Sequence, residues 1–154
     1  MTLSEAPGNL KKFRRTAWRF QQTFQTPLQS LPEFVNTIGS TGQPLRAGCL
    51  TIEQAVFEPT HLIGLLNNYS IPPRYGRGVA LTARGAQEVT ALLQAALGDW
   101  VDFIFVPEPK RFSLYADHDE YTTFFAQTRS HLNRLVEALT GQGFRAIQDY
   151  ERRF

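Results

Sequence analysis

A short acidic stretch between two apolar segments carries the side chains best suited to chemistry. It is the segment ADHDEYTTFF at residues 116–125, whose central residues are Asp117, His118, Asp119 and Glu120. Carboxylate oxygens and imidazole nitrogens bind metal ions and transfer protons. One hypothesis is therefore a metal-assisted hydrolase, with Asp117, His118 and Asp119 as candidate metal ligands and with Asp102 and Glu120 as further catalytic candidates.

The same acids fit a structural role at the start of a helix. A helix N-terminus has unpaired N–H groups and a partial positive charge, which Asp117 or Asp119 could cap, with Glu120 in the first turn. The spacing of His61, His118 and His131 matches no catalytic triad or zinc motif. We therefore expect capping. Whether the chain is an enzyme stays open, the balance favours a non-enzyme, and we expect no cofactor.

Basic residues supply two other candidate sites. The loop segment PPRYGRGVALTARG places Arg74 and Arg77 among glycines, where they could cradle a phosphate. It matches neither the Walker A motif nor the dinucleotide-binding pattern, so an ordinary basic surface loop is favoured. Near the N-terminus, Phe13, Phe20 and Phe24 lie at helical spacing among the basic residues Lys11, Lys12, Arg14, Arg15 and Arg19. We expect this basic helix to dock on the same chain or on a partner; contact with nucleic acid or a membrane surface, or a targeting role, is the alternative.

The elements that must position these residues are clearest in the second half of the chain. Over residues 77–154 the order is β-α-β-β-α-β, typical of the ferredoxin-like α+β arrangement, in which helices cover one face of an antiparallel sheet. The segment NYSIPPRYGRG at residues 68–78 has the prolines and glycines of a loop. We therefore predict an N-terminal helical or irregular region at 1–73, packed on a ferredoxin-like domain at 74–154 within one compact unit.

Alternation in the predicted hairpin assigns side chains to two faces. Pairing Val106 with Arg111 gives one apolar face, which should meet the helices. That face carries Val101, Phe103, Phe105, Phe112, Leu114 and Ala116. The opposite face mixes polar residues with an aromatic and aliphatic patch of Trp100, Ile104 and Tyr115. Apolar patches of this kind often mark interaction sites, although the N-terminal half of the chain could equally cover it.

Composition narrows the function classes. The 154 residues carry a net charge of +2, which does not identify a nucleic-acid binder, and 42% of them are hydrophobic, as in ordinary globular proteins. The single cysteine, Cys49, cannot form an internal disulfide and favours a reducing compartment, so we expect a cytoplasmic protein. We expect neither a transmembrane segment nor a signal peptide, because basic residues interrupt the first apolar cluster.

The leading hypothesis is a small non-catalytic binding module that acts in a protein complex or a homo-oligomer. Interfaces favour aromatic residues and arginine. Its expected binding residues are Trp100, Ile104, Tyr115, Arg14, Arg15, Arg19, Arg74 and Arg77. Nucleic-acid binding through the basic helix and the arginine loop is the first alternative, and the hydrolase is the second.

Overall fold

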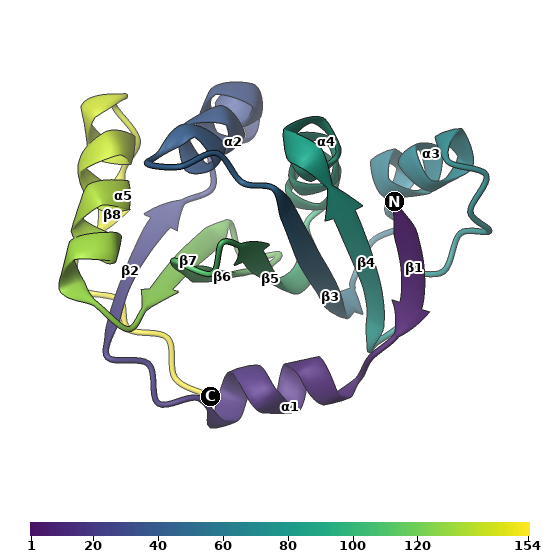
Figure 1. Ribbon diagram of the computed structural model, residues 1–154, viewed down its shortest axis with the longest axis horizontal. Coiled ribbons are helices and arrows are strands. Elements are labelled where there is room, and N and C mark those ends of the chain that lie inside the picture. The colour runs from purple at the N-terminus through teal and green to yellow at the C-terminus, as the bar shows by residue number, and fades with distance from the viewer.

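The computed structural model describes all residues from 1 to 154 and has two layers with an additional helix beneath them (Figure 1). One eight-stranded sheet has its strands in the order β1-β4-β3-β5-β6-β7-β2-β8, and every neighbouring pair is antiparallel. The strands are β1 (Thr2–Glu5), β2 (Phe20–Gln25), β3 (Ala47–Ala55), β4 (Val79–Arg84), β5 (Val101–Glu108), β6 (Ser113–Ala116), β7 (Tyr121–Ala126) and β8 (Ala146–Ile147).

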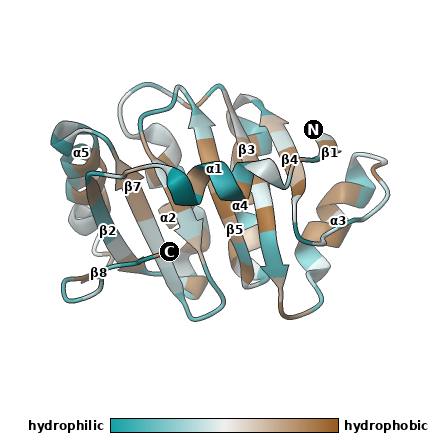
Figure 2. Ribbon diagram, turned by 90° about the horizontal axis from the view of Figure 1, so that it is seen from below, coloured by the Kyte–Doolittle hydropathy of each residue, from teal (hydrophilic) through white to brown (hydrophobic).

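Helices lie on both sides of this sheet, in unequal numbers. The helices α2 (Leu31–Ser40), α4 (Gly85–Gly98) and α5 (Arg129–Gly141) cover one face, with α3 (Thr60–Asn68) beside α4. Helix α1 (Gly8–Arg15) lies alone on the opposite face, which we call the open face (Figure 1). Figure 2 shows α1 crossing the strands, with the C-terminus close to its end.

The main core lies between the sheet and the larger helical layer. The apolar face predicted for the hairpin is confirmed, because all six of its residues are buried in this core. The hairpin register differs from the prediction by two residues, since Ile104 pairs with Tyr115. A shift of two residues leaves every side chain on its predicted face.

The α+β class is confirmed, but the six-strand ferredoxin-like order is not. Residues 77–154 form β-α-β-β-β-α-β, because the segment expected to start a long helix instead forms a turn and then strand β7. Asp117 accepts hydrogen bonds from the backbone N–H groups of Asp119 and Tyr121, and Glu120 adopts a positive φ of 71°. Helix α5 begins only at Arg129, after Thr128, whose hydroxyl caps it.

The expectation of a helical or irregular N-terminal region is wrong in its secondary structure. Residues 1–73 supply β1, β2 and β3, which alternate with later strands in the same sheet. The predicted basic helix ends at Arg15, and its second half becomes β2. That strand pairs with β7 on one side and with β8 on the other. Phe24 reaches the main core from this strand, so sheet pairing overrides the helical spacing of the phenylalanines.

Candidate functional site

Helix α1 covers the mixed face of the hairpin, which sequence analysis offered as a binding surface. Leu10 and Phe13 pack from the helix onto Ile104, Tyr115 and Phe125 of the sheet, and all five are buried. The patch is therefore covered by its own chain and is not open to a large partner. Trp100 is separate from it, because this residue forms the turn between α4 and β5 with a positive φ of 58°.

The acidic stretch at residues 117–120 forms the β6–β7 turn, and its side chains have separate partners. The backbone N–H of His118 donates to Asp102 Oδ1 at 2.7 Å, and His118 Nδ1 lies 2.9 Å from the same oxygen. Asp102 is buried, whereas the His118 side chain is about one-third exposed. The hydrogen bond to Asp102 raises the pKa of His118. The other ring nitrogen, His118 Nε2, lies 3.8 Å from Asp119 Oδ1, so this dyad could hold a proton between carboxylates.

Asp117, the other candidate ligand, is paired with a cation from the C-terminal segment. Arg152 forms an ion pair with Asp117 and lies over the ring of Tyr115, with its Cζ atom 4.4 Å from the ring centroid. Burial raises the pKa of Tyr115 to about 12, so its hydroxyl stays protonated at neutral pH. No three histidine, cysteine or acidic side chains converge in a way that could hold a metal ion. The Asp117 pair fastens the C-terminal segment to the open face.

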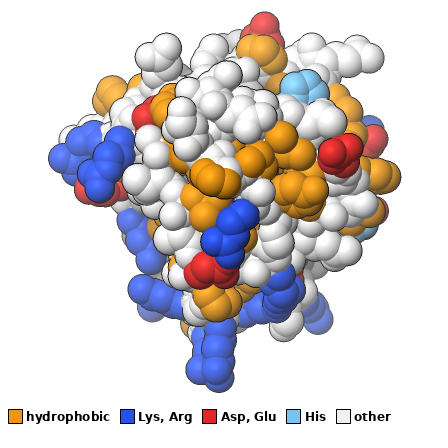
Figure 3. Space-filling view, turned by 90° about the vertical axis from the view of Figure 1, so that its right-hand side faces the viewer, with side chains coloured by type: hydrophobic (Ala, Val, Ile, Leu, Met, Phe, Trp, Pro, Cys, Tyr) orange, Lys and Arg blue, Asp and Glu red, His pale blue; other side chains and the backbone are white.

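The predicted arginine sites divide into paired and unpaired cations. Arg14 and Arg77 both contact Glu53, and Arg74 contacts Glu5. No ion pair involves Arg15 or Arg19, both of which are exposed. In Figure 3 the Lys and Arg side chains gather toward the lower side of the molecule, where α1 lies in Figure 1. The two arginines of the loop at residues 73–78 are thus held in ion pairs, Arg74 with Glu5 and Arg77 with Glu53.

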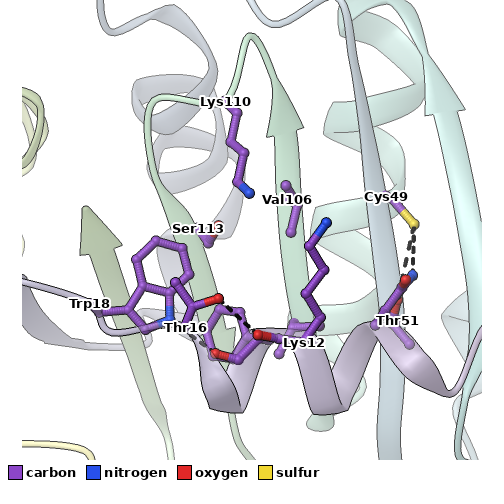
Figure 4. Close-up of a pocket in the computed structure, with 11 residues that line it drawn as sticks. Lys12, Thr16, Trp18, Cys49, Thr51, Val106, Lys110 and Ser113 are labelled. Carbon is purple, nitrogen blue, oxygen red and sulfur yellow. Dashed lines mark hydrogen bonds between the residues drawn. The ribbon is translucent and has the colours of Figure 1, made fainter. Parts of the chain in front are cut away.

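A pocket lies between α1 and the open face, and we call it the α1 pocket (Figure 4). It has a volume of about 320 Å³, at the lower end of the range for small-molecule sites. Its sheet side is formed by Cys49, Thr51, Ile104, Val106 and Ser113. Its other side is formed by residues of α1 and of the segment after it, namely Asn9, Lys12, Phe13, Thr16 and Trp18, and Lys110 of the β5–β6 loop completes the lining.

The register of the sheet explains how the polar floor of this pocket is assembled. Cys49 pairs with Val106, Thr51 pairs with Ile104, and Ser113 follows on the next strand. These side chains share one face because alternate residues of a strand point the same way. Asn9 of α1 donates a 3.0 Å hydrogen bond to Thr51 Oγ1, which ties the helix to the floor.

Two lysines and one serine give the pocket an unusual polar character. Lys12 and Lys110 extend toward the space over Val106 (Figure 4), and neither forms an ion pair. No acidic residue lines the pocket. The hydroxyl of Ser113 is buried and has no hydrogen-bond partner. Buried hydroxyls nearly always have a hydrogen-bond partner. A bound molecule could supply the partner that the Ser113 hydroxyl lacks.

Sequence reasoning identified only part of this pocket. It placed Ile104 on the mixed face, and it recognised Lys12 within the basic segment. It did not connect them with Lys110 or Trp18. The signal for Lys110 was its place at the hairpin turn, but no local pattern shows that α1 lies opposite that turn.

No helix of this chain combines the length and the apolar composition needed to cross a lipid bilayer. Comparisons with protein families, curated proteins and solved structures gave no significant match to this chain.

Proposed function

We propose that this protein is a non-catalytic binding module whose site is the α1 pocket and whose ligand is a small molecule. The single observation that carries this proposal is the pocket itself, which has apolar walls and a few polar groups on its floor and rim. Small-molecule sites typically have this combination, in which apolar surface supplies affinity and the polar groups fix orientation.

The arrangement of the open face supports a small ligand over a large partner. The aromatic patch at Ile104 and Tyr115 is already covered by α1, so a macromolecule could reach it only by displacing that helix. Displacement would expose Leu10 and Phe13 as well, at about 1.5–3 kcal/mol for each large apolar side chain. A small molecule can use the space beside the helix without this cost.

The separation of the acidic turn from the α1 pocket favours a binding function located in the pocket. His118 lies in the β6–β7 turn and Asp102 lies in β5, and neither lines the α1 pocket. Asp117 of that turn accepts two backbone N–H groups and forms an ion pair with Arg152. We therefore place the function in the pocket and assign the acidic stretch to the stability of the turn and the C-terminal segment.

The test is a fragment screen by two-dimensional NMR on the isotopically labelled full chain, with neutral, anionic and cationic fragments. We expect hits to shift the resonances of Trp18, Val106 and Ser113. A hollow of similar volume, about 360 Å³, lies between α2 and α4 beside Thr90 and serves as an internal control. Val106→Phe, which fills the α1 pocket, should abolish the shifts, whereas Thr90→Phe should preserve them. The proposal fails if no fragment of any charge binds beside α1.

A further inference from the structure

From the charges around the α1 pocket, we infer that its ligand is a small organic anion with a flat apolar body. This inference rests on the proposed function and names the chemical class of the ligand. The acidic group would lie between Lys12 and Lys110, and the body would lie against Trp18 and Val106.

The charge of the ligand follows from the two lysines. Both ammonium groups border one pocket with no carboxylate in its lining and no ion-pair partner elsewhere. Two like charges facing a shared space repel each other. An anion between them is attracted by both, and these two attractions offset the repulsion. Contacts between an ammonium and a carboxylate or phosphate are also stronger than neutral hydrogen bonds. A cation would meet only repulsion here.

The shape of the body follows from the apolar walls. Trp18 is fixed in place, because its indole N–H donates to the carbonyl of Phe13 at 3.2 Å and its ring packs on Phe13 and Phe125. A fixed aromatic ring binds another flat ring at low entropic cost. A volume of about 320 Å³ accommodates one or two rings and excludes a long chain.

The unpartnered hydroxyl of Ser113 gives the ligand a third contact point. It lies on the floor of the pocket, in the row of residues that also holds Val106. Because this hydroxyl has no partner within the chain, a ligand oxygen that reaches it could accept its hydrogen. The site thus combines two charges at its rim, an aromatic wall and one neutral donor at its floor.

The experiment measures binding of 1-naphthoate to the full chain by isothermal titration calorimetry, with neutral 1-naphthamide and inorganic phosphate as comparisons. Lys12→Met and Lys110→Met should each weaken naphthoate binding about threefold to tenfold, the equivalent of about 0.6–1.4 kcal/mol, and should leave naphthamide within about twofold. Lys11→Met is the matched control, because Lys11 is the adjacent lysine on α1 but does not line the pocket. That control should bind naphthoate like the wild type.

Several outcomes would overturn the inference while leaving the proposed function intact. Naphthamide binding as tight as that of naphthoate would show that the charge contributes nothing. Loss of affinity in Lys11→Met equal to that in Lys12→Met would show a diffuse surface charge instead of a site. Binding of inorganic phosphate as tight as that of naphthoate would show that the apolar body contributes nothing. If naphthoate and naphthamide both fail while cationic fragments bind in the pocket, the assigned charge is wrong and only the binding function stands.

Discussion

Replacing Ser113 with alanine should stabilise the unliganded protein, which is the opposite of what most substitutions of buried residues do. The Ser113 hydroxyl is buried without a hydrogen-bond partner. Burying an unpaired hydroxyl costs about 1–3 kcal/mol by mutational measurements. The void left by one oxygen atom offsets a few tenths of a kcal/mol, at about 24 cal/mol per Å³. We therefore expect the free energy of unfolding to rise by about 1–2 kcal/mol.

The assay is equilibrium unfolding in urea, followed by tryptophan fluorescence and circular dichroism. A real stability change moves the midpoint and leaves the denaturant slope unchanged. For a chain of this length the expected gain corresponds to a rise in Tm of about 3–6 °C. The same variant should show a smaller stabilisation by 1-naphthoate than the wild type, because stabilisation by a ligand grows with its affinity for the folded state.

The matched control removes a buried hydroxyl that does have a partner. Thr122 Oγ1 lies 2.8 Å from Thr26 Oγ1, and both residues are buried. Thr122→Val leaves the Thr26 hydroxyl unpaired, so this variant should lose about 1–3 kcal/mol. The reasoning is refuted if Ser113→Ala also loses 1 kcal/mol or more, since the hydroxyl would then have a stabilising partner in the folded protein.

Two further predictions concern the core and the β6–β7 turn. In Gly48→Ala the new Cβ would lie 2.2 Å from Cζ of the buried Phe105 ring, so overpacking should lower the free energy of unfolding in urea by about 1–3 kcal/mol. The control Gly64→Ala places its Cβ in open space within α3 and should raise the free energy of unfolding by about 0.5–1 kcal/mol. Equal effects of the two substitutions would disprove the clash. The pKa of His118 is raised above its ordinary 6.5 by Asp102, so its contribution to stability is complete below that value and is lost as the pH rises through the folded-state pKa. His118→Gln should therefore lose more stability relative to wild type at about pH 5.5 than at about pH 9, and an NMR titration midpoint for His118 below 6.5 would contradict this.

Local alternation was enough to determine which residues of the hairpin face the main core. The apolar residues from Val101 to Ala116 were assigned to the correct face even though the predicted register differed by two. The strand and helix expected at the start of residues 77–154 were also found, as β4 and α4. These features depend on side-chain periodicity, which is a property of neighbouring residues and needs no knowledge of the rest of the chain.

The acidic stretch shows where local information becomes ambiguous. Asp117 was expected to cap, and it does accept backbone N–H groups, but those groups belong to a turn between two strands. Caps and turns use the same residues for the same reason, since short polar side chains satisfy nearby backbone groups. Only the pairing of Tyr115 with Thr123 across β6 and β7 decides between them.

The sequence by itself determined the α+β class, the core-facing side of the hairpin and the basic, amphipathic character of the segment that becomes α1. The tertiary structure decided the insertion of β3 between β4 and β5, the conversion of Phe20 and Phe24 to strand β2, and the position of α1 over Ile104. These outcomes depend on contacts between residues far apart in the chain, whose free energies no local pattern records. Lys12 and Lys110 line the same pocket only because such contacts bring α1 opposite the hairpin.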